Sequence, residues 1–76
     1  MAKTLDRLSP NECAYIKLVH LSGSKRGRLQ ELGFISGAQV RCVHISPFGD
    51  PVAYEILDTV IALRRSDAQH IELIDE

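Results

Sequence analysis

Along most of the chain, hydrophobic residues alternate with polar ones in short runs, and only one stretch has a helical spacing. That stretch is 24–32, in which Leu29 and Leu32 fall three positions apart and so share one face of a helix. Gly33 supplies the left-handed backbone on which helices commonly end, and Phe34 can fold back on Leu29 as the apolar contact of a Schellman motif. The pattern predicts a short helix that carries its own stop signal.

Alternation elsewhere predicts five short strands with brief connections. Their ranges are 14–21, 40–46, 52–57, 60–63 and 71–74. The residues expected to share one face are Ile16, Leu18 and His20 in the first strand, and Val40, Cys42 and His44 in the second. With one real helix among five strands, the fold class is mainly β, a small and highly bent sheet or barrel.

The connections carry turn and capping signals. The runs Ser9-Pro10-Asn11-Glu12 and Ser66-Asp67-Ala68-Gln69 follow the capping-box pattern, and each predicts one helical turn. Pro47 to Pro51 predicts a tight turn around Gly49, and 58–59 predicts a second turn. Ser22 or Ser24 is expected to cap the helix at 24–32.

Length and charge narrow the range of functions. A chain of 76 residues is expected to form one domain, 1–76, with a small core and no room for a deep substrate pocket. Its net charge of −1, with interspersed signs, argues against nucleic-acid binding, which normally needs a basic face. The chain start lacks the apolar run of a signal peptide or membrane span, so a cytoplasmic location is expected.

The sequence contains no motif typical of a catalytic site. It contains no nucleophile elbow, zinc-protease helix or phosphate-binding glycine loop, and no pair of carboxylates at a useful spacing. We therefore expect no enzymatic activity.

Metal binding rests on one weak pair of ligands, Cys42 and His44, whose spacing would place both on one strand face. A carrier or sensor would need a third ligand, from His20 or Cys13. The alternative, that Cys42 is a small buried apolar residue, is favoured because two ligands do not make a site.

Lys25, Arg26 and Arg28 place positive charge in or near the first turn of the helix, where it opposes the helix dipole. Two interpretations stay open: a solvated helix face, with Arg28 paired to Glu31, or a binding surface for a negatively charged protein. Arg64 and Arg65 would extend such a surface if the fold brings them near. Apolar residues around Phe34, and Phe48 in the proline-rich turn, are further candidates for a partner-binding patch.

Three pieces of sequence, in this order, resemble the ferrous-iron transport protein A (FeoA) family. The first is Arg-x-x-Leu-x-x-Leu-Gly-Phe-Ile-x-Gly at 26–37, the second is Gly-Asp-Pro at 49–51, and the third is Ile-Ala-Leu-Arg-x-x-x-Ala at 61–68. The likeness runs from Leu5 to Ile74. One departure is Ser36, where the family usually has proline before the glycine, and it costs some rigidity in the turn.

The resemblance implies an SH3-like β-barrel of about five strands with one inserted helix. It also implies a cytosolic accessory protein of ferrous-iron uptake that docks on the cytosolic region of a GTPase-coupled, FeoB-like permease and meets the membrane only through it. No resident cofactor is implied, and Fe²⁺ would bind at most transiently. Binding of proline-rich peptides, which needs an aromatic-lined groove, fits poorly with four scattered aromatic residues.

On this basis, the helix and its flanking turn are the predicted docking surface. The residues assigned to partner binding are Arg26, Arg28, Leu29, Leu32, Gly33 and Phe34. The alternative function is a direct Fe²⁺- or Zn²⁺-binding carrier that uses Cys42 and His44.

Overall fold

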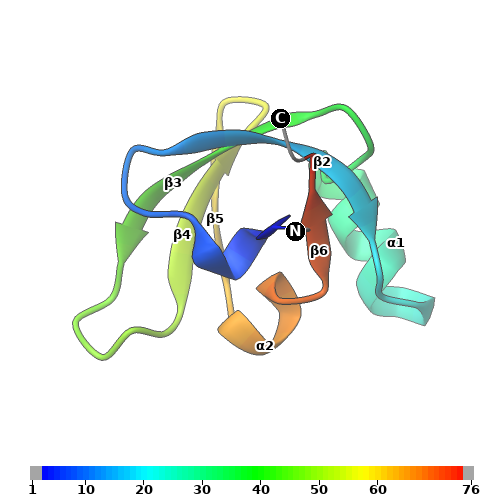
Figure 1. Ribbon diagram of the computed structural model, residues 1–76. Coiled ribbons are helices and arrows are strands. Elements are labelled where there is room, and N and C mark those ends of the chain that lie inside the picture. Colours follow the sequence, from blue (N-terminus) through cyan, green and yellow to red (C-terminus); the bar gives the residue numbers. More distant parts are fainter. Residues whose placement is uncertain (1–2, 75–76) are drawn as a thin grey trace.

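The computed structural model describes residues 3–74, which form six antiparallel strands, two helices and one 3₁₀ turn (Figure 1). The strands are β1 (Lys3–Thr4), β2 (Cys13–Val19), β3 (Gln39–Ile45), β4 (Val52–Ile56), β5 (Thr59–Leu63) and β6 (Ile71–Leu73). The helices are α1 (Gly23–Leu32) and α2 (Arg65–Ala68), and the 3₁₀ turn is η1 (Leu5–Arg7).

The strands follow the order β1-β6-β2-β3-β4-β5, and β2 is the member shared by the two halves of the bent sheet. This confirms the predicted mainly β class with one substantial helix. The strand β1 was not predicted, because two residues are too few to show alternation. Within residues 3–74, β1 and β5 do not pair, so the expected barrel stays open between its edge strands.

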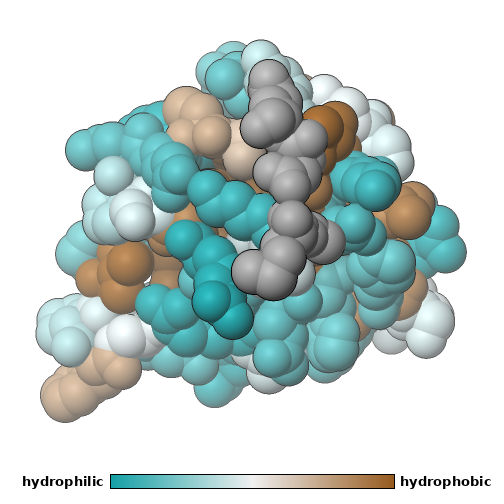
Figure 2. Space-filling model, viewed as in Figure 1, coloured by the Kyte–Doolittle hydropathy of each residue, from teal (hydrophilic) through white to brown (hydrophobic). Residues whose placement is uncertain are grey.

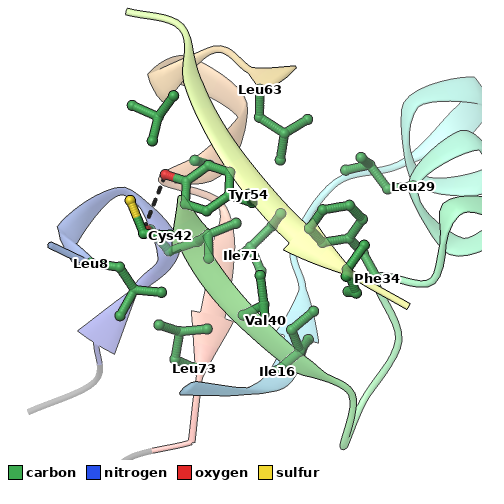
Figure 3. Packing of buried hydrophobic residues seen from close by; sticks show 14 residues of the cluster. Leu8, Ile16, Leu29, Phe34, Val40, Cys42, Tyr54, Leu63, Ile71 and Leu73 are labelled. Carbon is green, nitrogen blue, oxygen red and sulfur yellow. Dashed lines mark hydrogen bonds between the residues drawn. The ribbon is translucent and has the colours of Figure 1, made fainter. Parts of the chain in front are cut away.

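The core lies between the two halves of the sheet, and Tyr54 occupies its middle (Figure 3). Its hydroxyl donates a hydrogen bond to the carbonyl of Leu5, 3.2 Å away, which ties β4 to the 3₁₀ turn. Because the phenol is buried, its pKa is raised to about 12. Leu5 and Leu8 are both buried and belong to the same core.

The end of α1 has the predicted geometry. Gly33 has φ of 110°, its amide donates to Gln30 at 3.1 Å, and the amide of Phe34 donates to Leu29 at 2.9 Å. These two bonds define a Schellman motif. Phe34 is fully buried and lies near Leu29 in Figure 3, so the stop signal also fastens the helix to the core.

Two register shifts make the predicted strand faces wrong. One lies in β2 between Ile16 and Leu18, and the other lies in β3 between Cys42 and His44. An extra residue in one strand reverses the alternation beyond it. Ile16 and Cys42 therefore point inward as predicted, whereas Leu18, His20 and His44 are exposed.

The short connections differ in detail from the capping predictions. The main-chain amide of Ser9 donates a hydrogen bond to the Glu12 carboxylate, 2.9 Å away, but the segment is a turn rather than a helical turn. The helix α2 exists, yet it begins after Arg64 instead of at Ser66. The β4–β5 turn is formed by Leu57 and Asp58, one residue earlier than expected. Ser22 precedes α1 without a side-chain capping bond.

Candidate functional site

A groove of about 300 Å³ separates α1 from the edge strand β5, and we call it the α1–β5 groove. One wall is a single face of α1, formed by Lys25, Arg28, Leu29 and Leu32. The other wall is the run from Ile61 to Arg64, and the remaining lining residues are Leu21 and Asp67.

Charge is distributed unevenly on the rim of the groove. Lys25 is paired with Asp67 across the groove, with 3.1 Å between the ammonium nitrogen and a carboxylate oxygen. Neither Arg28 nor Arg64 forms an ion pair with any residue in the range 3–74. The rim therefore carries uncompensated positive charge above an apolar floor, an arrangement suited to an acidic partner.

The Lys25–Asp67 pair also explains how α1 tolerates positive charge at its start. Its first turn contains no acidic residue of its own, so Asp67 of α2 supplies the negative charge that the helix dipole favours there. The contact fixes α1 beside α2 at one end of the groove.

The structure divides the six residues predicted for partner binding. Leu29, Gly33 and Phe34 are buried, and of these only Leu29 reaches the groove, with 5% of its surface exposed. Leu32 is half-buried in the groove wall, whereas Arg26 and Arg28 are exposed. Arg26 does not line the groove, because it lies on another face of α1.

Arg64 and Arg65, which the sequence left unplaced, have different environments. Arg64 is exposed at the groove, beside α1. The Arg65 guanidinium instead donates to the carbonyl oxygens of Gly49 and Asp6, and its amide donates to the Asp50 carboxylate at 3.0 Å. Arg65 therefore joins η1, the β3–β4 turn and α2, and only Arg64 extends the basic surface.

The weak metal ligands are not brought together. Cys42 is fully buried and burial raises the pKa of its thiol, while His44 is exposed beyond the register shift. Of the proposed third ligands, Cys13 lines a separate hollow with Arg41 and Glu55, and His20 bonds to Glu72 at 2.8 Å. In the part of the chain described, no group of three or more metal-ligating side chains occurs.

Phe48 stands out from the surface, as its position in the turn suggested. Its side chain is 98% exposed at the tip of the β3–β4 hairpin, which protrudes at the lower left in Figures 1 and 2. The face shown in Figure 2 is mostly hydrophilic, with hydrophobic residues in separate patches. The hydrophobic residues visible on this face therefore form no continuous patch of the kind that marks a binding surface.

The sequence did not reveal that β5 forms half of the site. The strand at 60–63 was predicted, but which strand stands at the edge depends on the sheet order. The one signal in the sequence was the absence of charged residues from 59–63, which is unusual for an edge strand.

None of the helices within residues 3–74 is long and apolar enough to cross a membrane.

Comparison with known families gives one match that spans nearly the whole chain. Residues 3–74 match the family model described as the FeoA domain. A protein of Porphyromonas gingivalis, named as a fusion of Fe(2+) transport protein A and the Fe(2+) transporter FeoB, is 39% identical over 69 residues. The match includes 91% of this chain and 8% of that protein, so this chain spans a small part of the curated relative.

Solved structures give the same result at the level of the fold. The FeoA protein of Chlorobium tepidum has a TM-score of 0.89 at 27% identity, covering 93% of this chain and 68% of that one. The FeoA of Stenotrophomonas maltophilia, described as a procaryotic SH3 domain protein complexed with zinc, has a TM-score of 0.84 at 34% identity. That alignment covers 96% of this chain and 91% of the other. The SH3-like fold predicted from the resemblance is therefore confirmed.

Proposed function

This chain belongs to the FeoA domain family, and we propose on that premise that it is a non-enzymatic accessory protein that docks on the soluble cytosolic region of a ferrous-iron transporter. The observation that carries the proposal is the Porphyromonas gingivalis relative, in which a domain like this one and the transporter FeoB are parts of one polypeptide. A domain fused to a transporter works beside it, and a separate chain needs a binding surface to do the same.

The exposed side of α1 offers such a surface. Arg26 and Arg28 are exposed cations in the first half of the helix, and Leu32, one turn after Arg28, supplies half-buried apolar area on the groove side. Exposed charges of one sign accelerate and orient the approach of an oppositely charged partner. The docking residues that the proposal retains are therefore Arg26, Arg28 and Leu32, while Leu29, Gly33 and Phe34 hold the helix in place from the inside.

The test is a binding titration with the purified cytosolic domain of the transporter. The double variant Arg26→Glu plus Arg28→Glu should bind about tenfold more weakly or worse, because attraction is replaced by repulsion. The control is Arg7→Glu plus Lys17→Glu, which changes the net charge equally at exposed positions away from α1 and also removes the Lys17–Glu72 ion pair, at 3.4 Å. Equal affinity of both double variants would show that α1 is not the docking surface.

A further inference from the structure

The strand β5 is an unprotected edge of the sheet. It pairs regularly with β4 from Thr59 to Leu63 and has no second neighbour in the sheet order. Among the residues described, no backbone hydrogen bond joins β5 to any other segment. An edge of this kind presents a row of unpaired amides and carbonyls to which another strand can bind.

Proteins often block such an edge with charged residues, proline or a bulge, and β5 has none of these. The sequence Thr-Val-Ile-Ala-Leu contains neither a charged residue nor proline, and its pairing with β4 shows no register shift. Such an edge either promotes aggregation or is kept open to bind a partner.

The α1–β5 groove lies along this open edge rather than on one face of the strand. Three consecutive residues of the strand, Ile61 to Leu63, line the groove, and so does Arg64 just after it. Because side chains in a strand alternate between two faces, a groove against one face would be lined by every second residue. Lining by consecutive residues means that the backbone edge itself borders the groove.

The opposite wall suits an extended chain that carries both apolar and acidic side chains. Leu29 and Leu32 offer apolar contact, and Arg28 and Arg64 carry positive charge that no acidic residue within 3–74 neutralises. The two walls also agree in length, since the lining residues of β5, Ile61 to Leu63, extend about 10 Å, and the lining part of α1, Lys25 to Leu32, also extends about 10 Å.

We infer that an extended segment of the transporter's cytosolic region, with apolar and acidic side chains in alternation, adds to β5 as a seventh strand inside the α1–β5 groove. Strand addition beside a helix is an established way to bind extended peptides, in which main-chain hydrogen bonds give affinity and side-chain pockets give specificity. The inference rests on the proposed function and specifies how the partner is held.

Hydrogen exchange of the full chain tests the backbone part of the inference. Amide exchange is followed by NMR with the transporter's cytosolic domain and, separately, with an eight-residue test peptide that alternates valine and glutamate. In both mixtures the amides of Thr59–Leu63 that point away from β4 should exchange about tenfold more slowly, because they become hydrogen-bonded. Docking through side chains on α1 alone would leave their exchange unchanged.

N-methylated versions of the test peptide provide a control that cannot disturb the protein's own fold. Methylation of the alternate peptide amides that face β5 removes donors and should abolish binding, whereas methylation of the other set should leave the affinity within about twofold. Equal effects of the two methylation patterns would overturn strand addition.

Two single variants test the charge of the groove. Arg28→Glu should weaken binding of the test peptide about tenfold, because Arg28 lines the groove. Arg7→Glu, which is exposed and lies outside the groove, should change the affinity less than about twofold. A version of the peptide with lysine in place of glutamate should bind the unaltered protein much more weakly than the glutamate peptide does.

The outcomes separate this inference from the proposed function. If the transporter domain binds but β5 shows no added protection, strand addition is wrong and docking stands. If the test peptide protects β5 while the transporter domain forms no complex, the groove accepts an extended acidic segment and the proposed partner is wrong. If neither the transporter domain nor the test peptide protects β5, the inference is overturned.

Discussion

Leu57 lies directly against Gly33. A Cβ atom built on Gly33 would be 2.6 Å from Cδ1 of Leu57, closer than such atoms approach in proteins. Gly33 also has φ of 110°, where residues with a side chain are strained. The residue that ends α1 thus serves two purposes, since it allows the helix to stop and lets the β4–β5 turn pack on it.

Gly33→Ala should destabilise the fold by about 1–2 kcal/mol through its backbone conformation, plus any cost of moving Leu57. Gly37→Ala is the matched control, because Gly37 has φ of 88° but no atom near its hypothetical Cβ. Urea denaturation measures both variants. If both lose the same stability, the flexible Leu57 side chain moves aside without cost. If neither loses any, the left-handed conformation at these positions is wrong.

Arg65→Ala should destabilise the protein by about 1–3 kcal/mol, because the guanidinium donates to the carbonyl groups of Gly49 and Asp6. Arg64→Ala, one residue earlier and exposed, should change stability by less than about 0.5 kcal/mol. Thermal and urea denaturation compare the two. Equal effects would mean that the contacts of Arg65 contribute nothing beyond those of an exposed arginine.

Tyr54 should make the fold less stable as the pH rises above about 10, the ordinary pKa of tyrosine. Its pKa in the folded state is raised to about 12 by burial, so between these values the unfolded chain releases a proton that the folded chain keeps. Its contribution is complete below about pH 10 and falls through this window.

The measurement is urea denaturation at about pH 9 and about pH 11. Tyr54→Phe should reduce the loss of stability between the two pH values, whereas Tyr15→Phe, on an exposed face, should keep it. An unchanged loss in Tyr54→Phe would assign the pH dependence to other groups.

The two thiols should differ in reactivity. In the folded protein a water-soluble thiol reagent should modify Cys13, which is exposed, and spare Cys42, which is fully buried and whose pKa is raised. Addition of urea should release the second thiol. The Cys13→Ser variant should therefore be unreactive until it unfolds. Rapid modification of Cys42 in that variant would mean that β3 opens readily in the native state.

Local chemistry made some parts of this structure predictable. The end of α1 was predicted correctly because Leu29, Gly33 and Phe34 specify a Schellman motif within a few residues. The outward orientation of Leu18 and His44 was not predicted, because each residue follows a register shift that depends on the partner strand. The same limit applies to the groove. Arg28 and Leu32 were identified from α1, but the contribution of β5 depends on which strand ends the sheet.

The pairing of β1 with β6, in which Lys3 lies opposite Leu73, brings the first and last described segments side by side. A second protein could therefore be joined to the domain at either end without dividing the sheet. Within one polypeptide the two parts would meet at an effective concentration on the order of millimolar, so a weak contact would stay occupied. A separate chain has no such tether, so the fraction of its partner that it occupies would depend on its concentration in the cell.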